Sequence, residues 1–398
     1  MPDVTQAEPR SAAWAGWRTQ FLGGLRLWRL FVCLLPALPV ALYAQSQGTP
    51  FYGWQNATTQ AAFAPRDGAG LVTFNNQLWL LGGWNADPTV FPRTTTNEVW
   101  NSTDGQHWNR VKPNTFGDDF SASNDWEGRH MAGWVVFNNK LWIIGGDSNQ
   151  CHYQPNAWNS SDGAHWNEVS NSLPWGNRVL FYTLVFQGRI WVMGGQTLVL
   201  ADCPGYPQTE TIYNDVWSSV DGVSWTQVGE IGSLFAPTQA TTVHSVWSPR
   251  GVICGAVVFQ GKMWVVGGGT YGSPNYLYND VWNSSDGLNW TRVTASAPWE
   301  ARIYHDITVY DGRIWVIGGH APNGDGNLSD VWNSTDGVHW QQVPNTPWLP
   351  RHAASVAVYN GGIWITGGTT DENGSQDDVW KLDKGPIVPI INSQLLLN

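Results

Sequence analysis

The stretch DVWNSSDGLNW, residues 280–290, decides how this sequence folds, because close copies of it recur along the chain. The copies are EVWNSTDGQHW (98–108), NAWNSSDGAHW (156–166), DVWSSVDGVSW (215–225) and DVWNSTDGVHW (330–340). Each combines a short Val-Trp or Ala-Trp strand, an Asp-Gly pair that supplies the positive φ angles of a tight turn, and a second Trp. A catalytic motif needs only one copy, so the recurrence indicates a repeated architectural unit.

A second repeat is a Gly-Gly pair that ends an apolar run. It occurs six times, with its first glycine at Gly82, Gly145, Gly194, Gly267, Gly318 and Gly367. Another short apolar run precedes each one, separated from it by Asn-Asn, Gln-Gly, Asp-Gly or Asn-Gly, which are hairpin-turn sequences. Several short strands in a unit of about 50 residues predict an all-β, six-bladed β-propeller.

The last unit lacks one strand. It contains DVWKLD (378–383) but no second hairpin strand after it, whereas Trp54 lies 12 residues before Arg66, just as Trp290 lies 12 before Arg302. We therefore expect the segment around Trp54 to complete the sixth blade. Such a closure would remove the open sheet edges that invite aggregation.

Composition and the N-terminus restrict the partners and the compartment. Lys+Arg total 20 against 31 Asp+Glu, a net charge of −11 that argues against a nucleic-acid partner. Arginines followed by LFVCLLPALPVALYA (30–44) predict a secretory signal peptide over 1–44, with a retained signal anchor as the alternative. We expect the propeller over 45–384, a tail over 385–398, and a monomer that is secreted, periplasmic or extracellular and not membrane-bound after cleavage.

Three cysteines would remain after cleavage, in an export route that permits disulfides. Cys151 and Cys203 follow Gly-Gly pairs of consecutive units, and we expect a disulfide between them. Cys254 lies inside the apolar run VICGAVVF, so we expect it to be a buried free thiol, with a reactive cysteine as the alternative.

These motifs resemble the secreted kelch-repeat, galactose-oxidase-like β-propellers, whose units read W-x-x-R, G-G and D-V-W-x-S-x-D-G-x-x-W. The resemblance covers residues 51–382 and concerns the fold more than the function. In a four-stranded meander, loops alternate between two faces. The Gly-Gly to Val-Trp loops and the connections between blades vary in length and share one face, which we call the loop face and expect to bind the ligand.

Each unit also places an arginine at the start of its first strand, on the loop face. The six are Arg66, Arg129, Arg178, Arg250, Arg302 and Arg351. One hypothesis is a guanidinium ring at the channel mouth that binds carboxylates or acidic sugars, as matching arginines do in kelch adaptors. The other is a structural role in every blade, through pairing with the recurring Glu98, Asp215, Asp280, Asp330 and Asp378 or through stacking on Trp.

Residues that break the sixfold pattern are further candidates. They are Tyr304, His305, His130 and His352. Tyr304 and His305 stand in a segment similar to the Arg-x-Tyr-His that supplies copper ligands in galactose oxidase, which would also require a Cys-linked Tyr and a second His. Core or rim histidines are the alternative interpretation.

The sequence leaves three functions open. The first is a secreted, non-enzymatic propeller that binds a glycan or protein ligand, possibly acidic, with no cofactor or metal. The second resembles the kelch-type sialic acid mutarotases, with the arginines on the carboxylate and His130, His305 or Glu300 transferring protons. The remaining alternatives are a copper-radical oxidase or a structural module of a cell envelope or matrix.

Overall fold

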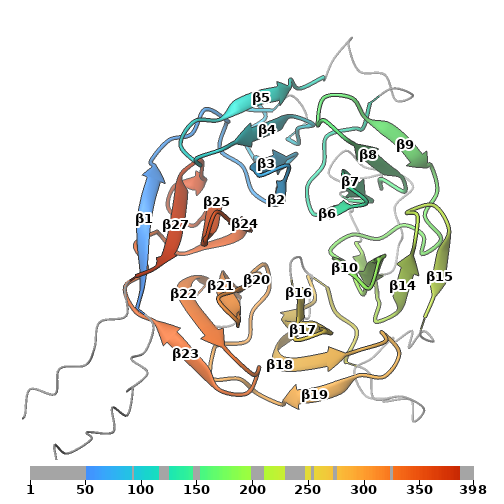
Figure 1. The fold of residues 1–398 in the computed structure, drawn as a ribbon, viewed down its shortest axis with the longest axis vertical. Helices are drawn as coiled ribbons and strands as arrows, with labels where there is room; N and C mark the ends of the chain where they lie inside the picture. Colours follow the sequence, from blue (N-terminus) through green and yellow to red (C-terminus); the bar gives the residue numbers. More distant parts are fainter. Residues whose placement is uncertain are drawn as a thin grey trace, which may run out of the picture. The chain divides into compact units, whose positions relative to one another are not determined.

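The computed structural model is an all-β ring of six antiparallel blades, which confirms the predicted six-bladed propeller (Figure 1). It describes residues 51–91, 94–115, 125–146, 153–198, 210–228, 247–251, 255–271, 276–322 and 326–385. The predicted signal peptide, the three cysteines and the tail beyond Gly385 lie outside these residues. No helix in the described ranges is long and apolar enough to cross a membrane.

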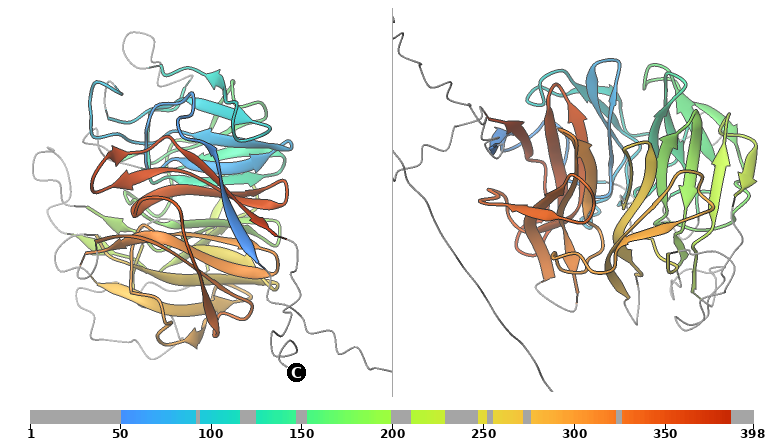
Figure 2. Two further views of the ribbon diagram at one scale, coloured as in Figure 1. Left: turned by 90° about the vertical axis from the view of Figure 1, so that its left-hand side faces the viewer. Right: turned by 60° about the horizontal axis from the view of Figure 1, so that its bottom comes forward.

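The first five blades are four-stranded meanders, and their sheets pack face to face around the ring (Figure 2). Blade 1 contains β2 (Gly70–Phe74), β3 (Gln77–Leu81), β4 (Val99–Ser102) and β5 (Asn109–Lys112). Blade 2 contains β6 (Gly133–Phe137), β7 (Lys140–Ile144), β8 (Ala157–Ser160) and β9 (Asn167–Ser170). Blade 3 contains β10 (Tyr182–Phe186), β11 (Arg189–Met193), β14 (Val216–Ser219) and β15 (Trp225–Gln227), with a small hairpin of β12 (Gln196–Thr197) and β13 (Thr211–Ile212).

Blades 4 and 5 have longer middle strands. Blade 4 contains β16 (Ala256–Phe259), β17 (Lys262–Gly269), β18 (Leu277–Ser284) and β19 (Thr291–Thr294). Blade 5 contains β20 (Asp306–Tyr310), β21 (Arg313–Ala321), β22 (Gly326–Ser334) and β23 (Trp340–Val343). In both blades the pairing continues past the Gly-Gly pair after a register shift, so these strands extend further on the loop face than those of blades 1 and 2.

Blade 6 joins the two ends of the propeller. It contains β24 (Arg351–Tyr359), β25 (Gly362–Thr370), β27 (Val379–Lys384) and the N-terminal β1 (Tyr52–Thr58), with β26 (Gly374–Ser375) beside β25. Strand β1 pairs antiparallel with β27, and Trp54 lies opposite Leu382. The Trp54 ring meets Trp348 edge-on at 4.2 Å, as Trp290 meets Trp247 at 6.0 Å in blade 4. The closure predicted from the Trp54 spacing is confirmed.

The two hairpin types of a blade use different turn chemistry. In the inner hairpin both turn residues have positive φ, for example 46° and 55° at Asn75 and Asn76, as a type I′ turn requires. In the outer hairpin only the glycine does, with φ of 72° at Gly105, so the expectation that both residues of the Asp-Gly pair supply positive φ angles is wrong there. Instead, Asp104 Oδ1 accepts the backbone N–H groups of Gln106 and His107, forming a longer connection.

The recurring Asp-Gly glycine also packs closely against a Trp of the neighbouring blade. A Cβ on Gly337 would lie 2.4 Å from a ring carbon of Trp264, which belongs to blade 4. Equivalent contacts join the following pairs: Gly105 with Trp364, Gly163 with Trp79, Gly222 with Trp142, and Gly287 with Trp191. Blade 6 has no such hairpin, and Tyr52 of β1 instead packs edge-on against Trp315 at 4.7 Å. The outer hairpin therefore recurs because each copy covers a neighbouring Trp.

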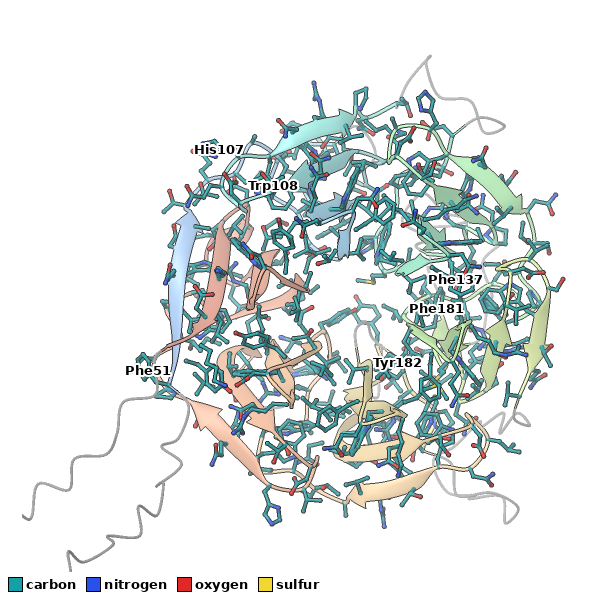
Figure 3. All side chains as sticks on the ribbon, viewed as in Figure 1. Phe51, His107, Trp108, Phe137, Phe181 and Tyr182 are labelled. Atoms are coloured by element: carbon teal, nitrogen blue, oxygen red, sulfur yellow. The ribbon has the colours of Figure 1, made fainter. Side chains whose placement is uncertain are left out.

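Side chains fill the spaces between blades. Figure 3 shows His107 and Phe51 on the outer side of the ring, and Phe181 and Tyr182 on its inner side. Fully buried tryptophans such as Trp126, Trp158, Trp247, Trp299 and Trp315 are among the largest core residues. Burying an aromatic side chain of this size contributes about 2–3 kcal/mol, so these interfaces dominate the stability of the ring.

Candidate functional site

The six arginines lie inside the blades. Their exposed fractions are 0–4%, and each donates a hydrogen bond of 2.9–3.2 Å from Nη1 to the carbonyl of the first glycine in its Gly-Gly pair. The second glycine contributes too, since Gly83 N–H donates to the Arg129 carbonyl of the next blade at 2.9 Å. The arginines and the Gly-Gly pairs thus form one repeated unit that ties strands and blades together.

Five of the arginines also form ion pairs with the acidic residue of the Val-Trp strand. Their closest N–O distances are 2.5–2.8 Å, in the pairs Arg66–Glu98, Arg178–Asp215, Arg250–Asp280, Arg302–Asp330 and Arg351–Asp378. Each carboxylate also accepts the indole N–H two residues later, as Trp332 donates to Asp330 at 2.6 Å. Burial alone would raise the pKa of Asp330, but the Arg302 guanidinium holds that pKa below its usual value.

In blade 2, two amide side chains accept hydrogen bonds from the arginine. Arg129 donates to Asn156 Oδ1 at 2.9 Å and to Gln154 Oε1 at 3.1 Å, because Asn156 occupies the position of the acidic residue. In blades 3 and 4 a tyrosine ring also covers the guanidinium, with Tyr213 at 3.6 Å from Arg178 and Tyr278 at 3.7 Å from Arg250. These contacts match the structural interpretation of the arginines, and they leave no guanidinium facing solvent.

The residues two positions after the arginines form the innermost part of the ring. Gly68, Met131, Leu180, Tyr304 and Ala353 all have φ between 50° and 63°. Neighbouring members bond through their backbones, since Gly68 N–H donates to Ala353 O, Ala353 N–H to Tyr304 O, and Met131 N–H to Gly68 O. Left-handed backbone costs about 1–2 kcal/mol for a residue other than glycine, so the inter-blade hydrogen bonds must offset that strain.

Side chains of this inner ring gather into one apolar cluster. Leu180, Tyr304 and Ala353 belong to it together with Val179, Ile303 and Tyr153, and Met131 packs against it. With Leu277 of blade 4 also packed against it, the cluster draws on blades 2 to 6, so it joins residues from opposite sides of the ring. Its core residues are buried, so the cluster fills the middle of the ring with apolar side chains.

The predicted histidines lie in three different places. His305 is fully buried between blades 4 and 5, where its Nε2 lies 2.9 Å from the Val266 carbonyl. Burial and the nearby Arg302 charge lower the pKa of His305 to about 4. His130 is also buried, and its ring stacks on Trp84 at 5.8 Å. Glu300 is half-buried, and its backbone carbonyl accepts the Arg302 Nε hydrogen.

His352 belongs to a polar cluster on the loop face of blades 5 and 6. His352 Nδ1 lies 2.7 Å from Asn327 Oδ1, and His320 Nδ1 lies 3.2 Å from the same oxygen. Asn327 Nδ2 donates to Asp371 Oδ1 at 2.9 Å and to the Thr369 carbonyl at 3.2 Å. We call these five residues, His320, Asn327, His352, Thr369 and Asp371, the mouth cluster.

Tyrosines continue the mouth cluster toward blade 4. The Tyr304 ring lies 5.4 Å from His352, and the Tyr271 ring lies 6.1 Å from Tyr304. The Tyr271 side chain is 49% exposed, while its backbone is fixed by both amide atoms of the buried Gln196. Aromatic and polar groups therefore lie side by side on the loop face.

Electrostatics at the mouth cluster favour a neutral His352. Burial and the neighbouring His320 together lower the pKa of His352 to about 4, against a smaller opposing effect of Asp371. On the blade 1 side, Thr369 Oγ1 donates to Asp67 Oδ2 at 2.6 Å. Among the described residues, no three His, Cys, Asp or Glu side chains are placed to hold a metal ion.

Sequence reasoning found His352 and the neighbouring Tyr304 but missed the other four residues of the mouth cluster. One signal was available: the residue after each Gly-Gly pair differs in every blade, as Trp84, Asp147, Gln196, Gly269, His320 and Thr369. Asn327 carried no such signal, because it becomes a partner of His320 only when β21 and β22 extend past the Gly-Gly pair.

No family model matches this chain, and no curated protein sequence matches it.

Proposed function

We propose that this chain is a secreted, kelch-type propeller that binds a glycan on its loop face without catalysing a reaction on it. The observation that carries the proposal is the mouth cluster with Tyr304 and Tyr271, which occurs in one sector of an otherwise repeated ring. Repeated residues serve every blade, whereas a group found once needs another explanation. Binding residues concentrate on such irregular loops of rigid scaffolds.

The chemistry of this sector suits a sugar. Sugars present apolar C–H faces next to hydroxyl groups, and a partly exposed tyrosine ring beside hydrogen-bonding side chains complements both. A protein ligand would be the alternative expected from the sequence, and the same surface would then contact a side chain. We favour the glycan because the polar groups converge on one small area instead of spreading over several loops.

The geometry favours binding over the acid-sugar mutarotase reaction. That reaction was expected to use the arginines on the carboxylate and His130, His305 or Glu300 on the proton. The guanidinium groups are buried in contacts inside the blades, and His305 is sealed between two blades. The copper-radical alternative relied on His305 as well, and its cysteine partner lies outside the described residues.

A thermal-shift screen of the purified protein with neutral and acidic oligosaccharides tests the proposal. A ligand at 100 times its dissociation constant should stabilise the fold by about 2.7 kcal/mol, which raises the melting temperature measurably. Tyr271→Ala should remove the shift, because this exposed ring belongs to the site. Val338→Ala is the control, since Val338 is similarly exposed, at 44%, but lies in an outer hairpin turn on the opposite face. Absence of any shift across the glycan panel would overturn the proposal.

A further inference from the structure

The orientation of the Asn327 amide requires a hydrogen on Nδ1 of both imidazoles in the mouth cluster. Its Nδ2 faces two acceptors, the Asp371 carboxylate and the Thr369 carbonyl, so the NH₂ group must point there. Oδ1 therefore faces the two imidazoles, and each imidazole must carry a hydrogen on Nδ1 to donate to it. Asn327 is 5% exposed, and pairing between β21 and β22 holds it opposite His320.

An imidazole that is neutral and protonated on Nδ1 has its lone pair on Nε2. The rings of His320 and His352 lie 5.6 Å apart, and neither Nε2 has a hydrogen-bond partner within the described part of the chain. Asn327 thus creates two neighbouring acceptors on adjacent blades.

The charged groups around these acceptors are acidic. Asp371 and Asp67 are joined to the cluster through Asn327 and Thr369. The nearby cations are occupied, since Arg302 and Arg351 lie in ion pairs with Asp330 and Asp378. The whole chain also carries a negative net charge, −11. Such a surface repels carboxylates and accepts hydroxyl hydrogens.

We propose that His320 and His352, oriented by Asn327, are the acceptors for two hydroxyl groups of a neutral sugar. This inference rests on the proposed glycan-binding function and reverses the acidic ligand that the six arginines indicate in the sequence. Asn327 is a positioning residue, because it acts through the imidazoles. Tyr304 and Tyr271 provide the apolar side of the site.

Binding measurements with matched sugars test the charge preference. We expect galactose-, glucose- or mannose-containing oligosaccharides to bind at least about tenfold more tightly than the corresponding uronic acids. Tighter binding of the uronic acids would overturn this inference and leave the glycan-binding function standing. Binding of no sugar at all would overturn both.

Replacing one imidazole tests the acceptors. His352→Phe keeps an aromatic ring against Tyr304 but removes both nitrogens, and we expect at least a tenfold loss of affinity for the neutral sugar. His107→Phe is the matched control, because His107 is highly exposed in an outer hairpin. The unfolding midpoints of both variants show whether the fold is intact. If it is, unchanged affinity in His352→Phe would overturn the inference.

The pH profile distinguishes positioning by Asn327 from a purely structural role. The groups facing His352 are His320 on β21, Tyr304 before β20, Asp371 after β25, and Asp67 across Thr369. Binding should weaken as pH falls toward about 4, the lowered pKa of His352, because the protonated Nε2 of that ring can no longer accept a hydrogen bond. Asn327→Asp adds a negative charge beside both imidazoles, which should shift the loss of binding to higher pH. An unshifted profile in a folded Asn327→Asp variant would contradict the proposed role.

Discussion

Gly337→Ala should destabilise the propeller far more than Gly312→Ala, although both glycines lie in hairpin turns of blade 5. Their φ angles are similar, 75° and 67°, so both substitutions place alanine in left-handed backbone. A Cβ on Gly312 meets nothing within 4 Å, whereas a Cβ on Gly337 would lie 2.4 Å from Trp264 Cζ3. The difference in stability between the two variants therefore measures the steric contact between Gly337 and Trp264 of the neighbouring blade.

The magnitude follows from these two terms. The backbone strain costs about 1–2 kcal/mol in either variant. The steric conflict adds about 1–3 kcal/mol in Gly337→Ala, because Trp264 is 3% exposed and cannot move outward freely. We expect a loss of about 1–2 kcal/mol for Gly312→Ala and about 2–5 kcal/mol for Gly337→Ala.

Urea unfolding followed by tryptophan fluorescence measures both losses under one set of conditions. A double variant, Gly337→Ala with Trp264→Leu, supplies the internal check. If the conflict is between these two residues, the double variant should be more stable than the sum of the single effects predicts, with a coupling of about 0.5 kcal/mol or more. Equal losses for the two alanine variants, or strict additivity in the double variant, would refute the reasoning that the repeated glycine is a seat for the neighbouring Trp.

Three further predictions concern closure, ion pairing and pH. Trp54→Ala should cost about 2–4 kcal/mol by scanning calorimetry, because it leaves Trp348 without its edge-on partner, and a neutral result would mean that β1 does not close the ring. Arg302→Met should cost about 3–5 kcal/mol in urea unfolding, since it leaves the Asp330 carboxylate partly buried without its cation; a loss below 1 kcal/mol would indicate that the pair is not structural. The pKa of Asp162 is lowered to about 2: burial raises it, but hydrogen bonds from His165, Ala164 and Ser160 more than compensate. This stabilisation is present above the unfolded pKa of about 4 and is lost as pH falls toward 2, so the urea midpoint should fall less over that range in Asp162→Asn than in the parent chain.

Much of the fold could be predicted because it depends on local and repeated chemistry. Val-Trp strands, type I′ turns at Asn75 and Asn76, and the Gly-Gly pairs each specify a short-range geometry that the sequence repeats. The spacing from Trp54 to Arg66 predicted the closure, because β1 supplies an aromatic at the same place as every other outer strand. The outer turn was misjudged because its aspartate acts through its side chain and not through its own φ angle.

The sequence by itself determined a six-bladed ring, its closing strand and the loop face, since periodicity carries all of these. Only the tertiary structure decided what the arginines do. The sequence does not show whether a guanidinium points into the channel or pairs with a carboxylate such as Asp330. The mouth cluster also needed three dimensions. Asn327 and His352 stand on different blades, and they meet because the extended strands of blades 5 and 6 converge on the loop face. Contacts within a repeat can be inferred from its pattern, whereas contacts between unlike residues of different repeats depend on how the ring brings them together.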